Sequence, residues 1–220
     1  MNQLESANTN PIVNAFVEGG FVMYVILVIG ILVTILVIER FMTLKSLRVD
    51  KKEFTDQIFK MIVGGDIRQA ISFCDTKSTP MTNTVKSGLI QVMNKRPDEE
   101  VQVAMDASVL REMPKLEGFT SFLAVFGNLS VLAGLLVTII GMIGSFRAVS
   151  SADPATKAQL LSEGISHALN CTGFGLMVAI VAILFYGLFQ HMIQKSENEL
   201  LETSMTLMNL VAGNRDKLRD

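Results

Sequence analysis

Three long stretches without a single Asp, Glu, Lys or Arg residue constrain the fold of this chain more than any other feature. They cover 21–38, 120–146 and 165–189. Because the shortest is about 18 residues long, each can cross a hydrocarbon core of about 30 Å as an α-helix rising 1.5 Å per residue. Buried helices of a water-soluble domain are the alternative. Three such stretches in 220 residues, with a mean hydropathy of +0.42, favour an all-α integral membrane protein with three transmembrane helices.

The positions of Lys and Arg predict the orientation of the chain, since loops rich in these residues stay on the cytoplasmic side of a membrane. Neither residue occurs before position 21, and only Arg147 and Lys157 lie between the second and third stretches. Clusters follow the first and third stretches, at Arg40, Lys45, Arg48, Lys51 and Lys52, and at Lys195, Arg215, Lys217 and Arg219. We therefore expect a protein of the bacterial inner membrane with a periplasmic N-terminus and a cytoplasmic C-terminus.

This orientation divides the chain into segments on alternate sides of the membrane. We expect a periplasmic amphipathic segment at 1–20, transmembrane helices at 21–39, 119–146 and 165–190, a cytoplasmic helical domain at 40–118, a periplasmic link at 147–164 and a cytoplasmic C-terminal helix at 191–220. The first and last segments are amphipathic, and two of the three transmembrane helices are expected to continue into long cytoplasmic helices.

Glycine and proline residues predict where the helices of the cytoplasmic domain begin and end. Gly64-Gly65-Asp66 is expected to end one helix and cap the next, and Ser78-Thr79-Pro80 to begin a third. Pro97, followed by three acidic residues, is typical of a helix N-terminus. From there we expect one helix of about 45 residues, kinked at Pro114, that runs on into the second transmembrane stretch.

Small and hydroxyl residues form a narrow stripe along each of the last two transmembrane stretches. Residues three or four apart share one face of a helix, and small residues let membrane helices approach closely. Such faces also suit the wall of an ion pathway. The first stripe is Gly127, Ser130, Gly134, Thr138, Gly141 and Ser145, and the second is Ala168, Thr172, Gly175, Ala179 and Ala182.

Two threonines, Thr138 and Thr172, are the most informative members of these stripes. Both are expected about 10–12 Å deep, at similar levels, if the two helices are antiparallel. Their hydroxyls can bond the backbone carbonyl four residues earlier, which is the structural alternative, or they can solvate a cation or bond a carboxylate. None of the three stretches contains Asp or Glu, and an ion path through a membrane usually needs an ionisable group. We therefore expect a partner to supply that group.

Other residues that can carry chemistry are few. His167, five residues before Thr172, is a candidate for proton entry or for tuning the pH dependence, with a structural hydrogen bond as the alternative. We find neither a Walker loop nor a metal-ligand cluster in the sequence, and Cys74 and Cys171 are expected to be small buried hydrophobic residues. We expect no enzymatic activity, no cofactor, no bound metal and no nucleic-acid partner.

Several segments resemble the ExbB/TolQ/MotA family of motor stator proteins, in its three-span ExbB/TolQ branch. REMPKLE at 111–117 is similar to the family's REVPRLE, and GLLVTIIGM at 134–142 to its GLLGTVxGM. GISHALNCTGFGL at 164–176 is similar to GIxEALxxTxxGL, and Glu39-Arg40 and GDIRQA at 65–70 also fit. The resemblance covers nearly the whole chain.

Three positions depart from the family pattern. Val131 replaces a proline, Val137 replaces the middle glycine of GLLGT, and His167 replaces the acidic residue of the third span. The first two can alter helix bending, and the third removes a negative charge, so any role of the family's carboxylate in proton transfer does not carry over to this chain. Thr138 and Thr172 match the pore threonines of the family.

The resemblance implies a pentameric ring around a dimer of an ExbD/TolR-like single-span partner, whose intramembrane Asp takes the proton. It implies conversion of ion motive force into rotation or force. The expected translocated ion is H⁺, with Na⁺ as the alternative. A membrane scaffold without ion conduction is the rival hypothesis from another class. Outer-membrane import, Tol-type envelope maintenance and gliding share this core, so the driven process stays open. The expected pathway residues are Ser130, Gly134, Thr138, Gly141 and Ser145 of the first stripe and Ala168, Thr172, Gly175 and Ala179 of the second, with His167 as the candidate for proton entry or pH tuning.

Overall fold

The computed structural model describes residues 20–47 and 49–215, and regular structure in these ranges is entirely α-helical. This confirms the predicted all-α class. The predicted amphipathic segment at 1–20 lies outside the described residues except for Gly20. In chain order the helices are α2 (Gly20–Leu47), α3 (Lys51–Val63), α4 (Ile67–Asp75), α5 (Pro80–Met93), α6 (Asp98–Glu117), α7 (Thr120–Ser150) and α8 (Lys157–Gly213).

The chain divides into two compact units, which we call the membrane unit and the polar unit. The membrane unit holds the described residues up to Glu39 together with Phe119–Gly187, and the polar unit holds Arg40–Gly118 together with the residues from Leu188. Three helices, α2, α7 and α8, contain windows long and apolar enough to cross a membrane. This confirms the three predicted transmembrane helices.

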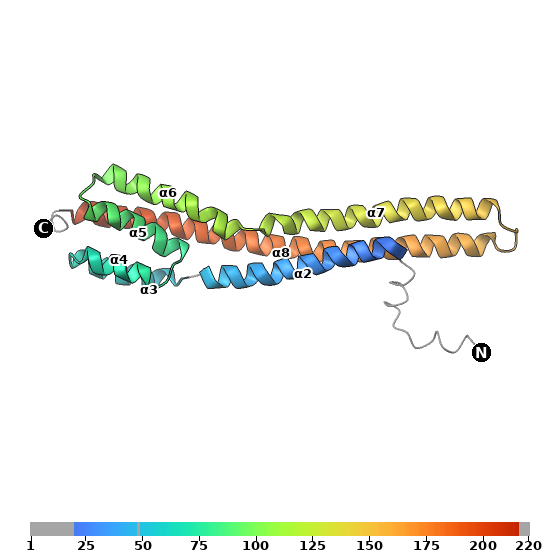
Figure 1. Ribbon diagram of the computed structural model, residues 1–220, viewed down its shortest axis with the longest axis horizontal. Helices are drawn as coiled ribbons and strands as arrows, with labels where there is room; N and C mark the ends of the chain where they lie inside the picture. The colour runs from blue at the N-terminus through green and yellow to red at the C-terminus, as the bar shows by residue number, and fades with distance from the viewer. Residues whose placement is uncertain (1–19, 48, 216–220) are drawn as a thin grey trace, which may run out of the picture. The chain divides into compact units, whose positions relative to one another are not determined.

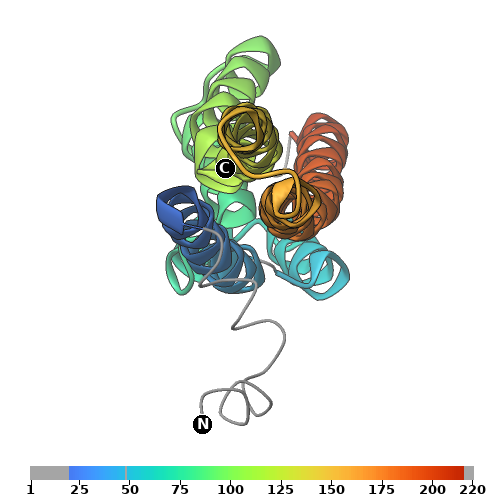
Figure 2. The same cartoon turned by 90° about the vertical axis from the view of Figure 1, so that its right-hand side faces the viewer.

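Within the membrane unit, α7 and the first part of α8 run side by side, and α2 lies along them (Figure 1). Seen from one end, the three helices occupy the corners of a triangle (Figure 2). Helical structure continues into the predicted link, because α7 ends only at Ser150 and α8 already begins at Lys157. The non-helical connection within the predicted link covers residues 151–156 and contains Pro154, a residue that disrupts a helix interior.

Short polar side chains begin two helices of the polar unit. The Asp50 carboxylate accepts bonds from the backbone N–H groups of Lys52 and Glu53, at 3.0 and 3.3 Å. Thr79 and Thr82 form a reciprocal capping box at the start of α5, as Ser78-Thr79-Pro80 predicts. Asp66 stands before α4 but makes no side-chain cap bond, so the predicted capping role of Asp66 is wrong. Its φ and ψ, −86° and 64°, differ from the extended backbone usual at a cap.

The prediction of one continuous helix from Pro97 into the second transmembrane stretch is also wrong. The break lies at Gly118, where φ is +43°, and α7 begins two residues later at Thr120. Pro114 lies inside α6, which continues to Glu117. The physical reason for the break is local, because the buried Arg40 guanidinium packs where a Cβ atom on Gly118 would stand. Only glycine satisfies both the dihedral angle and this contact.

Replacing Gly118 by alanine should therefore destabilise the polar unit by about 1–3 kcal/mol, the usual range for a strained non-glycine backbone. Thermal unfolding of the purified protein in detergent measures the effect as a lower Tm. Gly213→Ala is the matched control, since a Cβ there meets no heavy atom within 4 Å, and removing a flexible glycine from a helix raises stability slightly. Equal Tm values for the two variants would contradict this account of Gly118.

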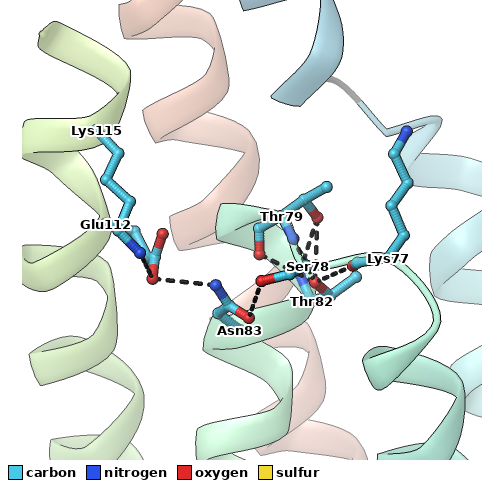
Figure 3. A network of polar contacts seen from close by, with 7 residues as sticks. All are labelled: Lys77, Ser78, Thr79, Thr82, Asn83, Glu112 and Lys115. Carbon is cyan, nitrogen blue, oxygen red and sulfur yellow. Dashed lines mark hydrogen bonds and ion pairs between the residues drawn. The ribbon is translucent and has the colours of Figure 1, made fainter. Parts of the chain in front are cut away.

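A polar network around the buried Glu112 carboxylate joins α5 to the end of α6 (Figure 3). The Glu112 carboxylate is nearly inaccessible and accepts bonds from Asn83 Nδ2 at 3.1 Å and Lys115 Nζ at 2.6 Å. The amide oxygen of Asn83 in turn accepts a bond from the Ser78 hydroxyl at 3.3 Å. Both Glu112 and Lys115 belong to the REMPKLE segment. That segment therefore fixes the last turns of α6 against α5.

Cys74 lies buried in the polar unit. Burial, together with the neighbouring Asp75 carboxylate and against the opposing effect of Lys86, raises the pKa of the Cys74 thiol to about 12. The side chain therefore stays a neutral thiol at physiological pH. This agrees with the prediction that Cys74 acts as a small hydrophobic residue.

Candidate ion pathway at the seam of α7 and α8

The contact line between α7 and the first part of α8, which we call the seam, is built from residues with minimal side chains. A Cβ atom on Gly134 would lie 3.0 Å from the Cα atom of Thr172. A Cβ atom on Gly141 would lie 3.2 Å from the Cβ atom of Ala168. At both positions the two helices touch almost backbone to backbone, which is how small residues stabilise helix pairs in lipid.

The two predicted stripes therefore face each other within one chain. The buried stripe members are Gly127, Ser130, Gly134, Ser145, Ala168, Gly175, Ala179 and Ala182, whereas Gly141, Thr138 and Thr172 are half-buried. The periodicity correctly predicted which residues share a face. Close packing inside one chain is the contact that the structure shows for the buried members, and a role in lining a pathway stays a prediction for them.

The Thr138 and Thr172 hydroxyls are hydrogen-bonded to each other across the seam. Thr138 Oγ1 also lies 3.1 Å from the Gly134 carbonyl oxygen and 3.4 Å from that of Ala168. Thr172 Oγ1 lies 3.0 and 3.3 Å from the same two carbonyl oxygens. Four oxygen atoms from two helices thus converge on one point. The expectation that the two threonines lie at one level is met.

This arrangement includes the acceptors of the structural alternative, because each threonine hydroxyl lies within hydrogen-bond distance of the carbonyl oxygen four residues earlier on its own helix. It also goes beyond that alternative, since each hydroxyl reaches the other helix as well. A hydroxyl rotates at little cost and has one donor and two acceptor sites. The half-buried pair can therefore accept a bond from a neutral acid, donate to a carboxylate, or offer oxygen ligands to a hard cation.

Hydrophobic packing holds α2 against the seam next to this pair. Met23 of α2, Val137 of α7 and Cys171 of α8 form one buried cluster, with Phe174 packed against it. Val137 stands where the family pattern has a glycine. The isopropyl side chain of Val137 fills space among all three helices of the membrane unit. Cys171 is a small buried hydrophobic residue, as predicted.

Two further features of the seam were not predicted from the sequence. Gly164 of α8 lies so close to Ser145 of α7 that an added Cβ atom would overlap the serine hydroxyl, which itself donates to the Gly141 carbonyl at 2.8 Å. The carbonyl oxygens of Gly134 and Ala168 are the second feature, because a sequence pattern identifies side chains and not backbone acceptors. His167 is half-buried on α8, about 140° around the helix from Thr172, and its role stays a prediction.

Comparison with known proteins identifies the family. Residues 76–202 match the model of the MotA/TolQ/ExbB proton channel family. An ExbB-like biopolymer transport protein of Synechocystis is 27% identical over 173 residues, which cover 78% of this chain and 81% of the relative. The Tol-Pal system protein TolQ of Pseudomonas aeruginosa is 40% identical over 91 residues, covering 41% and 39%. TolQ of Haemophilus influenzae is 27% identical over 187 residues, covering 78% and 80%. The chain, a membrane protein with three apolar helices, belongs to the MotA/TolQ/ExbB proton channel family.

Proposed function

We propose that this chain is the stator and ion-channel subunit of an inner-membrane motor that converts proton motive force into rotation or force for an envelope process. We further propose a homopentameric ring around a dimer of an ExbD/TolR-like single-span partner. The observation that carries the proposal is the half-buried Thr138–Thr172 pair, with its two shared carbonyl oxygens, in a chain of a proton channel family.

The partner is needed because the chain itself lacks an acid at this depth. The three apolar stretches hold no Asp or Glu, and proton relays in membranes usually depend on one. We propose that an aspartate of the partner lies beside Thr138 and Thr172. When ionised it accepts hydrogen bonds from the hydroxyls, and when protonated it donates one to them. Native mass spectrometry of the complex should give the mass of five copies of this chain and two of the partner.

Sodium is the second candidate ion. Two hydroxyl and two carbonyl oxygens converge at the threonine pair, and uncharged oxygen ligands also suit a hard cation. The two ions are separated by measuring the driven process in cells while one gradient is removed at a time. We expect a protonophore to stop the process and replacement of external sodium to leave it intact. The reverse result would assign the sodium-driven branch.

The orientation is proposed from the Lys and Arg asymmetry, with the N-terminus periplasmic and residues 40–118 cytoplasmic. Single cysteines at Ser6, Lys86 and Asp153, in a background without Cys74 and Cys171, test it with a membrane-impermeant maleimide. In intact cells we expect labelling at positions 6 and 153 and protection at 86. Labelling at 86 with protection at 6 would reverse the topology.

A further inference from the structure

An apolar groove of about 650 Å³ runs between α2 and α8 within the membrane unit. Its α8 residues lie on a different face of that helix from Thr172. The lining residues are Met23, Ile26, Leu27, Gly30, Ile31, Val33, Thr34 and Ile35 of α2, and Phe174, Met177, Val178 and Val181 of α8.

The residues of α2 give the groove a floor and an open edge. Met23, Ile26 and Val33 are almost fully buried and form the floor, whereas Ile31 and Ile35 are about half exposed and form the edge. The one hydroxyl in the lining is that of Thr34, and it donates to the Gly30 carbonyl at 2.8 Å. The lining is therefore hydrocarbon, and its one hydroxyl already donates within α2 rather than to a polar ligand.

We propose that this groove holds one acyl chain of a membrane phospholipid as a resident ligand. Its edge residues continue into the exposed apolar surface of α2, a helix long and apolar enough to cross a membrane. The groove thus opens directly onto lipid. A straight hydrocarbon chain is thin, flexible and apolar. It can contact the floor residues of α2 and the lining residues of α8 at once, and these many weak dispersion contacts add up.

Peptide occupants fit the groove poorly. A 20-residue helix about 10 Å across fills roughly 2,400 Å³, several times the volume available here. A non-helical peptide would bring backbone N–H and C=O groups into an apolar site that offers them no partners. A neighbouring helix could at most cover the open edge, and the experiment below separates that case from an acyl chain.

The absence of tryptophan from the sequence makes a direct test available. We would place a single tryptophan at Ile31, which lines the groove, or at the adjacent Leu32, which does not. Both side chains are exposed, and the two positions differ by only ~1.5 Å in depth. Leu27→Trp and Val28→Trp form a second pair of the same kind. Each full-length variant is reconstituted with phospholipid in which an increasing share of the acyl chains is brominated, and contact quenching of tryptophan fluorescence is recorded.

We expect the groove position of each pair to reach half-maximal quenching at a several-fold lower share of brominated lipid than its neighbour. Equal quenching curves would show that lipid contacts the groove no more strongly than the neighbouring helix surface, and would overturn the proposal. Protection of the groove positions alone would show that a protein helix covers the groove and would overturn it as well. The test concerns neither ion flow nor the partner, so its outcome is independent of the proposed function.

Discussion

Replacing Thr172 by valine is expected to abolish ion-driven work while leaving the complex assembled. Valine keeps the shape of threonine but removes the hydroxyl that bonds Thr138 and the Gly134 carbonyl across the seam. In the proposed mechanism the partner's carboxylate then loses a hydrogen-bond donor, which costs on the order of several kcal/mol for a buried charge. The measurement is the driven process in cells, together with native mass spectrometry of the purified variant.

Thr34→Val is the matched control for this experiment. Thr34 also bonds the carbonyl four residues earlier, that of Gly30 at 2.8 Å, but it lies on α2, away from the seam. The same chemical change there should leave activity intact, while Thr138→Val should behave like Thr172→Val. Wild-type activity of an assembled Thr172→Val complex would refute the ion pathway and favour the scaffold hypothesis.

His167→Ala is expected mainly to shift the pH dependence of the driven process, which is measured in cells at a series of external pH values.

Gly134→Leu is expected to separate α7 from α8 and to destabilise the membrane unit. The first atom of any side chain at 134 would already lie 3.0 Å from the Cα atom of Thr172, where only a backbone shift makes room. Overpacking of this kind typically costs about 1–3 kcal/mol or more. It would also displace the Gly134 carbonyl that Thr172 uses. We expect a lower Tm in detergent and loss of the oligomer in native mass spectrometry.

Gly144→Leu provides the control on the same helix. A Cβ atom at 144 meets no heavy atom within 4 Å, so the larger side chain projects into open space. The variant should keep the Tm and the oligomer of the wild type. If Gly134→Leu matched it in both measurements, close packing at the seam would not be what holds α7 and α8 together.

Much of the fold could be predicted because it depends on local chemistry. The three charge-free stretches required three membrane-spanning helices, and Thr79-Pro80 and Pro97 predicted the starts of α5 and α6 to within one residue. The spacing of three and four along the stripes predicted which residues share a face. It could not say what that face meets, because a small-residue stripe serves a helix pair inside one chain and a wall around a partner equally well.

The remaining features depend on contacts between residues distant in sequence. The break at Gly118 involves the Arg40 guanidinium, and no helical period reports such a neighbour. The bond between Asn83 and Glu112 joins residues 29 positions apart. The similar depth of Thr138 and Thr172 was expected from the sequence. The two carbonyl oxygens that complete the cluster could not be predicted, because a sequence pattern does not identify backbone acceptors.

The shared carbonyl oxygens of Gly134 and Ala168 bear on how fast such a site can work. They give both threonine hydroxyls an alternative acceptor within the chain. In the proposed cycle the hydroxyl protons turn toward the carboxylate when it is ionised and back to the carbonyls when the acid is neutral. Neither half of the cycle then leaves a buried hydroxyl donor without an acceptor, a penalty of about 1–3 kcal/mol that would otherwise fall on one of the two steps. Without that penalty neither step is slowed by an unsatisfied hydroxyl, which favours rapid turnover.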